Sequence, residues 1–163
     1  MLPTFSKIGL FWLTNRMNPG QEHFLSESFK QKIYSEINKI ESIKSNKTTW
    51  LLFLPPNEHH EIGLLFSRFL LLNNGYNVIY LGANVPLNSI KQVSETVDIN
   101  NILFFSIANY SKENLESITN YLFENLSHVN RYLVSNVSGL NKLFKKNKIK
   151  LVDDIDKFIK LIS

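Results

Sequence analysis

The fold of this 163-residue chain is decided by the stretch TTWLLFLPPNEHHEIG, residues 48–63. Its first half is an apolar run without polar alternation, which is typical of a strand covered on both faces in a parallel sheet. Two prolines end the run, and the loop that follows holds two carboxylates, two histidines and a glycine. The stretch therefore predicts a buried strand whose carboxyl end leads into a polar loop.

Downstream of this stretch, short apolar runs keep alternating with helical segments. We expect strands at residues 48–54, 77–81, 101–105, 131–135 and 148–152. We expect helices at residues 61–74, 86–96, 112–126, 140–145 and 154–162. Gly75 is placed to end the first helix, while Ser111 and Asp154 (or its neighbour Asp153) can cap later ones. This alternation predicts an α/β fold with a doubly wound, flavodoxin-like five-stranded parallel sheet.

The residues before this region predict part of a helical bundle, so we divide the chain into domains at 1–46 and 47–163. Asn18-Pro19 is a helix start signal, with Asn as the cap and Pro in the first turn. An apolar stripe follows at helical spacing, made of Leu25, Phe29, Ile33, Ile37 and Ile40. Residues 8–17 predict the end of another helix, antiparallel to the first. Because two helices bury little by themselves, we expect the stripe to pack on another element, such as a second copy of the chain.

The composition excludes several kinds of chemistry. The chain has no cysteine, which excludes disulfides, thiol nucleophiles and Cys-based metal sites. The motifs GxSxG, GxGxxG and GxxxxGK[ST] are absent. Five lysines crowd the stretch 142–150, but no aromatic or arginine pattern accompanies them, so we interpret this basic segment as a solvated loop and strand edge. No leader and no membrane-length apolar run occur, so we expect a cytoplasmic protein without a membrane partner.

Ligands of a doubly wound sheet bind at the carboxyl ends of its strands. Three polar segments fall there, namely NEHHEIG (57–63), SIANYS (106–111) and SNVSG (135–139). Glu58 lies two residues before His60, so its carboxylate can fix the tautomer of a metal-binding imidazole. His59 and His60 tend to point apart in an extended loop, which argues against both binding one ion. From these residues alone, surface histidines and a ligand site are equally open.

The spacing of these residues resembles that of the cobalamin-binding domain. That family carries DxHxxG after its first strand, then SxT or SxL, and then GG further along the chain. Here residues 58–63 match the first motif with Glu in place of Asp. Ser106-Ile107-Ala108 stands at the second motif, and Ser135-Asn136 stands where GG would be. The resemblance covers the chain from residue 48 onward.

Upstream, Trp12 is followed after nine residues by Glu22-His23. This W-x9-EH pattern resembles the adenosylcobalamin-binding regulators with a MerR-type DNA-binding head, among them light-responsive repressors. The resemblance implies a cobalamin-binding sensory and oligomerisation module of a MerR-like transcriptional regulator, not an enzyme. It also implies that the chain begins at about the third helix of a four-helix bundle. DNA would then be contacted only through a winged-helix head that this chain lacks, and we expect a homo-oligomer.

The resemblance also implies a role for each site residue. His60 would be the lower cobalt ligand, with Glu58 orienting it. Gly63 would make room for the nucleotide tail of the cofactor, Ser106 would hydrogen-bond its displaced base, and Ser135 and Asn136 would border the tail. Trp12, Glu22 and His23 would lie over the upper face of adenosylcobalamin, the expected form of the cofactor. His59 and Glu61 would take no part.

Two departures from the family pattern keep alternatives open. Leu13 stands where light-responsive members carry a histidine that binds cobalt after photolysis, so a bis-histidine photoproduct cannot form by that route. The side chains of Ser135-Asn136 would crowd the tail. One alternative is a corrinoid carrier subunit of a methyltransferase. Another is a degenerate domain that keeps the fold but no longer binds the cofactor.

Overall fold

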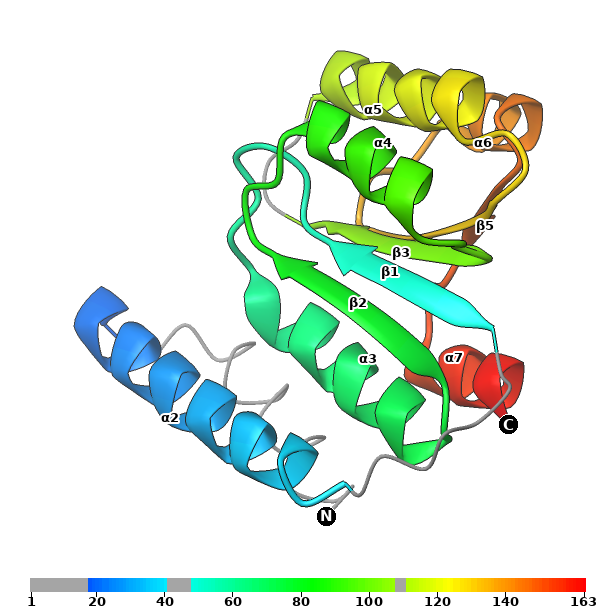
Figure 1. Ribbon diagram of the computed structural model, residues 1–163. Coiled ribbons are helices and arrows are strands. Elements are labelled where there is room, and N and C mark those ends of the chain that lie inside the picture. Colours follow the sequence, from blue (N-terminus) through cyan, green and yellow to red (C-terminus); the bar gives the residue numbers. More distant parts are fainter. Residues whose placement is uncertain (1–17, 41–47, 108–110) are drawn as a thin grey trace.

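The computed structural model describes residues 18–40, 48–107 and 111–163. A five-stranded, all-parallel sheet runs through these residues in the order β2-β1-β3-β4-β5 (Figure 1). The strands are β1 (Thr49–Phe53), β2 (Asn77–Gly82), β3 (Asn101–Ser106), β4 (Asn130–Ser135) and β5 (Ile149–Leu151). The predicted α/β fold, with its doubly wound, flavodoxin-like five-stranded parallel sheet, is confirmed.

Helices cover both faces of the sheet, as the predicted order requires (Figure 1). One face carries α3 (Glu61–Asn73) and α7 (Ile155–Ile162), and the other carries α4 (Leu87–Thr96), α5 (Lys112–Asn125) and α6 (Asn141–Lys146). The predicted end of the first helix and the predicted caps of two later helices are also confirmed. Gly75, at φ +75°, follows the end of α3, and the side chains of Ser111 and Asp154 accept backbone N–H bonds at the starts of α5 and α7.

Burial on both faces explains why the strands show no polar alternation. Along β1, Leu51 and Phe53 enter the core beneath α4 and α5, whereas Trp50 and Leu52 enter the core beneath α3 and α7. All six residues of β3 are buried, and the four between its polar end residues are apolar and enter the two cores in the same way. Both sides of the central strands must therefore be apolar, and this is the pattern from which the fold was predicted.

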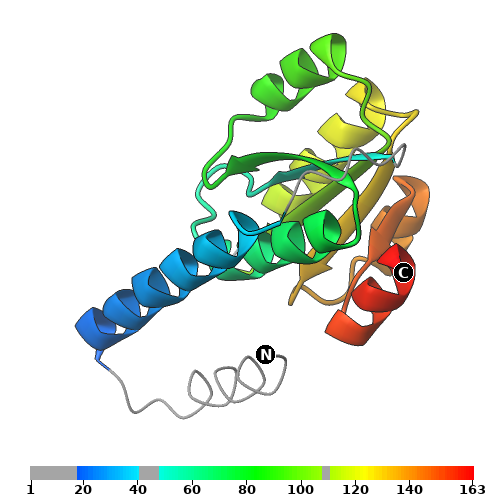
Figure 2. The same cartoon turned by 60° about the horizontal axis from the view of Figure 1, so that its bottom comes forward.

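The N-terminal helix α2 (Pro19–Ile37) lies outside α3, and its first turns project past the body of the molecule (Figure 2). Asn18 Oδ1 accepts the backbone N–H of Gln21 at 2.9 Å, and the Gln21 side chain accepts the Asn18 N–H at 3.1 Å, so the predicted cap is confirmed. Ile33 and Ile37 are buried against Leu65 of α3.

Two of the five residues of the apolar stripe, Ile33 and Ile37, are thus covered by α3, so the stripe packs on another element as expected; a second copy of the chain at Leu25 and Phe29 stays a prediction. The homo-oligomer itself stays a prediction. The helix expected at residues 8–17 lies outside the described residues. The basic segment forms α6 and β5, where the lysines are exposed as expected. None of the helices in the described part of the chain is both long and apolar enough to cross a membrane.

We predict that Ile33→Ala will release α2 from α3. Truncation of a buried isoleucine costs about 2–5 kcal/mol, and this contact joins α2 to the rest of the fold. Hydrogen exchange should show faster exchange of the α2 amides with little change in the sheet. Phe24→Ala is the matched control, because Phe24 lies on the same helix and is 73% exposed. Equal loss of protection in both variants would contradict this packing arrangement.

Candidate functional site

The loop after β1 holds a buried carboxylate behind a half-exposed imidazole. The Glu58 side chain is fully buried, whereas that of His60 is 48% exposed. Glu58 Oε1 lies 2.6 Å from His60 Nδ1 and accepts the backbone N–H groups of His59 and His60 at 3.0 and 3.1 Å. Glu58 Oε2 accepts the backbone N–H of Ile107 at 2.7 Å. Glu58 therefore joins the loops that follow β1 and β3.

This arrangement fixes the chemistry of His60. An ionised carboxylate only accepts hydrogen bonds, so the Nδ1 that faces Glu58 must carry the proton. The neutral ring then keeps its lone pair on Nε2, which makes Nε2 the nitrogen that can bind a metal. A carboxylate behind the imidazole also makes it a stronger donor. The predicted pairing of Glu58 with His60 is present in the structure.

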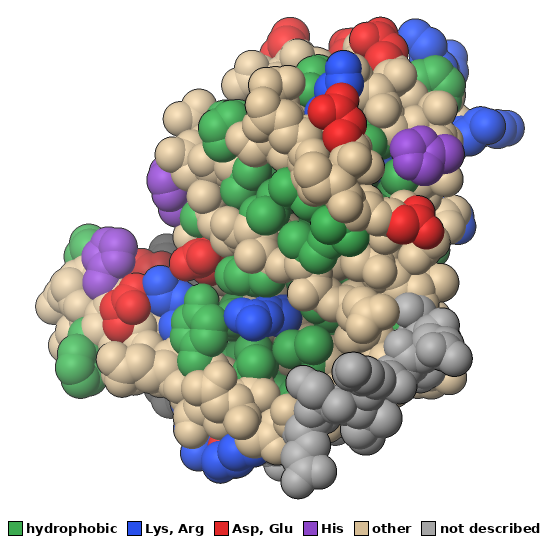
Figure 3. Space-filling model, in the orientation of Figure 1, with side chains coloured by type: hydrophobic (Ala, Val, Ile, Leu, Met, Phe, Trp, Pro, Cys, Tyr) green, Lys and Arg blue, Asp and Glu red, His purple; other side chains and the backbone are tan. Residues whose placement is uncertain are grey.

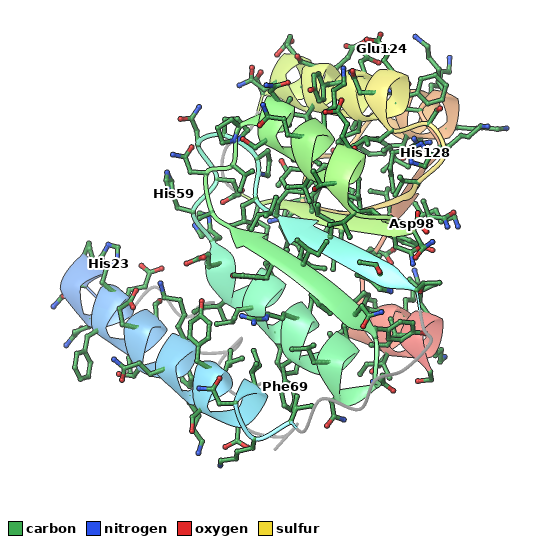
Figure 4. The ribbon with its side chains drawn as sticks, in the orientation of Figure 1. His23, His59, Phe69, Asp98, Glu124 and His128 are labelled. Carbon is green, nitrogen blue, oxygen red and sulfur yellow. The ribbon has the colours of Figure 1, made fainter. Side chains whose placement is uncertain are left out.

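A cavity of about 300 Å³, which we call the upper cavity, lies between α2 and this loop. Its lining residues are Glu22, His23, Ser26, Glu27, Lys30, His59, His60, Glu61 and Ile62. Acidic, basic and imidazole side chains gather over the N-terminal half of α2 (Figure 3). His23 on α2 and His59 on the loop lie at the same end of the molecule (Figure 4). The structure thus brings Glu22 and His23 to the cavity that His60 lines.

Two residues that the sequence analysis set aside belong to this region. His59 lines the upper cavity beside His60. Glu61 lies next to Lys30 of α2, with 3.4 Å between Oε2 and Nζ, and accepts a hydrogen bond from the Tyr80 hydroxyl at 3.3 Å. Burial, followed by the charge of Glu61, raises the pKa of Tyr80, so its hydroxyl stays protonated and donates. Glu61 therefore ties α2 to the start of α3 and to the edge strand β2.

A second cavity of about 210 Å³, which we call the lower cavity, lies between α3, the sheet and α7. Its lining is mostly apolar and includes Gly63, Phe66, Phe105, Val134, Ile155 and Phe158. A Cβ atom added at Gly63 would lie 2.7 Å from Phe105 Cε1, which is too close for any side chain. Only glycine at this position lets the Phe105 ring lie against α3.

The remaining predicted site residues are scattered. Ser106 is buried, and its Oγ has no hydrogen-bond partner within the described part of the chain. Ser135 Oγ accepts the backbone N–H of Val137 at 3.1 Å, and Asn136 is exposed. The lining of the lower cavity includes Val134 but neither Ser135 nor Asn136. Trp12 lies outside the described residues.

Sequence reasoning included Gly63 but missed the other residues that shape the lower cavity. Strand alternation could have identified Phe105, because it lies on the same face of β3 as Leu103, whereas Ser106 points to the opposite face. Gly63, Phe66 and Ser67 lie three and four residues apart and so share one face of α3. The backbone N–H of Ile107, which binds Glu58, has no sequence signal because every residue except proline has this group.

No protein-family model and no curated protein matches this chain. Solved structures do match, and three of them have a TM-score of 0.60 each. The monomethylamine corrinoid protein of Methanosarcina barkeri is 13% identical over 83% of this chain and 62% of its own. A cobalamin-binding protein from Desulfitobacterium hafniense DCB-2 is 13% identical over 95% of this chain and 74% of its own.

The methanol:cobalamin methyltransferase complex MtaBC of Methanosarcina barkeri contains a third similar chain. It is 18% identical over 74% of this chain and 47% of its own, with a TM-score of 0.60. This chain thus spans about three fifths of the first of these proteins and about half of the third. Its fold is that of corrinoid-protein domains, and the likeness at this level of identity is one of fold.

We predict that Glu58→Gln will change the tautomer of His60. In the unmodified protein, ¹⁵N NMR of the neutral ring should show a protonated Nδ1 and an unprotonated Nε2, because Nδ1 faces a carboxylate. An amide oxygen is a weaker acceptor than a carboxylate, so Gln at position 58 should shift the ring toward the Nε2–H form that dominates in a free histidine side chain. His59 and His23 are internal controls whose tautomers should not change. An Nε2–H tautomer of His60 in the unmodified protein would contradict the geometry.

We also predict a small coupling between Lys30 and Glu61. The double-mutant cycle of Lys30→Met and Glu61→Gln should give about 0.2–1 kcal/mol in urea unfolding, as expected for a partly exposed pair. Hydrogen bonds to Glu27 and then Glu61 raise the pKa of Lys30, so the coupling should persist at neutral pH. It should be lost as the pH rises beyond the ordinary lysine value of 10.5.

Lys32→Met is the control for this cycle. Lys32 lies on the same helix but pairs with Glu36 at 3.1 Å. It should therefore show no coupling to Glu61→Gln. A coupling as large as that of Lys30 would mean that the measured value reflects helix charge and not the contact with α3.

Proposed function

We propose that this chain is a cobalamin-binding module in which His60 provides the lower axial ligand of cobalt. The observation that carries this proposal is the orientation of the His60 imidazole by the buried carboxylate of Glu58 at 2.6 Å. This pair lies at the carboxyl edge of a doubly wound sheet, where such folds bind ligands. The upper cavity, which His60 lines, and the lower cavity, which Gly63 lines, supply space for a large ligand.

The residues around His60 fit a corrinoid. A bound cobalamin supplies a cobalt atom that exchanges axial ligands. His60 Nε2 would bind this metal from below, and Glu58 would hold the ring in position. The Ser106 hydroxyl, which is buried without a partner in the described residues, would gain one from a group entering beside β3. The lower cavity, bordered by Gly63 and Phe105, would receive some of whatever group lies beneath the corrin ring.

The finer role that we propose is a sensory module of a MerR-like transcriptional regulator, without catalytic activity of its own. Glu22 and His23 line the cavity that His60 also lines, which supports the W-x9-EH pattern as a cap over the upper face of adenosylcobalamin. Ligand binding between α2 and the loop would change the position of α2 and hence the assembly of the module. In this proposal the DNA is contacted by a winged-helix head outside this chain.

A corrinoid carrier subunit of a methyltransferase is the second candidate. It is favoured by the fold, which this chain shares with a monomethylamine corrinoid protein and with a chain of a methanol:cobalamin methyltransferase complex. A carrier accepts a methyl group when a partner methyltransferase is present. A sensor instead changes its oligomeric state when adenosylcobalamin binds or is photolysed. Size-exclusion chromatography with adenosylcobalamin, in the dark and after illumination, separates the two.

We predict that the purified protein will retain hydroxocobalamin through gel filtration and that His60→Ala will change the cobalt absorption spectrum. The histidine ligand is lost in this variant, so the affinity should fall by about 10–100-fold or more. His59→Ala is the matched control, since it removes the neighbouring imidazole without removing the proposed ligand. A colourless protein after reconstitution would overturn cofactor binding and favour a degenerate domain. Equal spectra of the two variants would overturn the role of His60.

A further inference from the structure

The ring of Phe105 forms one wall of the lower cavity, which Phe66 and Phe158 also line. Phe105 is the last apolar residue of β3, is only 6% exposed, and lies against Gly63 of α3. The space that remains is about 210 Å³. Pockets that hold drug-sized ligands measure about 300–1,000 Å³. A cobalamin nucleotide tail, with its base, ribose and phosphate, is a ligand of that size, and the cavity holds only part of it.

The charges around the lower cavity also oppose a nucleotide. Asp153 and Asp154 line it at the start of α7. The Asp154 side chain already caps this helix by accepting the N–H of Asp156 at 2.7 Å, so the helix start is occupied by an acid. Asp153 is paired with Lys157 at 2.6 Å. A phosphodiester entering here would meet the carboxylate of Asp154, whereas the charge of Asp153 is balanced by Lys157. A like charge held close to the phosphate disfavours binding.

We propose that Phe105 determines which corrinoids this chain accepts, and that it favours a corrinoid without a lower nucleotide over cobalamin. This inference rests on the proposed corrinoid site and names its preferred ligand class. Phe105 does not touch cobalt; it acts by limiting the space beneath the corrin ring. Gly63 cannot relieve the limit, because it already has no side chain. Of the two surfaces that meet there, only the Phe105 ring can be made smaller.

The test compares the affinities of cobinamide, which lacks the nucleotide, and hydroxocobalamin, by visible absorbance and calorimetry. The unmodified protein should bind cobinamide at least tenfold more tightly. Part of this ratio of the cobinamide affinity to the hydroxocobalamin affinity arises because the dimethylbenzimidazole of cobalamin must first leave the cobalt. The decisive quantity is therefore how much the affinity ratio changes in Phe105→Leu. Leucine is smaller and more flexible than phenylalanine, and the variant should narrow the ratio at least tenfold by gaining affinity for cobalamin.

Phe104→Leu is the matched control. Phe104 is the neighbouring residue on β3, is fully buried, and stacks on Phe53 in the core on the other side of the sheet. Phe104→Leu removes about as many packing contacts as Phe105→Leu but leaves the lower cavity unchanged. The ratio of the cobinamide affinity to the hydroxocobalamin affinity should therefore stay as in the unmodified protein. An equal change of ratio in both variants, or no change in Phe105→Leu, would overturn the proposal.

A second measurement separates this inference from the proposed function. Free 5,6-dimethylbenzimidazole, followed by ligand-observed NMR, probes the cavity without any corrin. Phe105→Leu should bind it at least tenfold more tightly than the unmodified protein and Phe104→Leu do. Failure of every variant to bind either corrinoid would overturn the proposed function. If the free base binds the three proteins equally, or binds none of them, the role of Phe105 is overturned whatever the corrinoids do.

Discussion

The candidate site depends on one buried carboxylate. A charge removed from water costs several kcal/mol unless hydrogen bonds replace its hydration. Glu58 gains three backbone N–H donors and one imidazole, drawn from the loops after β1 and β3. Glu58 has one methylene more than the aspartate of the cobalamin-binding motif. Its two carboxylate oxygens still accept hydrogen bonds from two different loops. Both the position of His60 and the closure of the sheet edge follow from these bonds.

The upper cavity beside this loop and the lower cavity between α3, the sheet and α7 differ in kind because different elements build them. The upper cavity lies against α2 and is lined by imidazoles and charged side chains of both signs. The lower cavity is enclosed by α3, the sheet and α7, and three phenylalanines line it. Polar, partly hydrated walls adapt to a ligand by rotation of side chains, whereas a packed aromatic wall changes only when a ring moves. Selectivity is therefore expected from the lower cavity.

The sequence predicted the fold well because its signals are local. Strands buried on both faces are apolar throughout, and the Asn18 cap and the glycine after α3 mark helix ends by their own chemistry. The pairing of Glu58 with His60 was predictable for the same reason, since only His59 stands between them in the sequence. Contacts between distant residues had no such signal. Glu61 with Lys30, and Gly63 with Phe105, are brought together only by the packing of α2 and β3 against α3.

These differences also indicate how ligand binding could be transmitted through the molecule. The sheet and its helices share two continuous cores, so a ligand would have to disrupt much packing to move them. In contrast, α2 rests on one smaller cluster, in which Ile33 and Ile37 pack on Leu65 among partly buried side chains of α3 and β2, and on the weak contact of Lys30 with Glu61. A ligand in the upper cavity would touch the residues of α2 directly, and a smaller cluster holds this helix than holds the sheet. The helix α2 is therefore the element whose position a bound ligand can change, and a change in assembly would begin there.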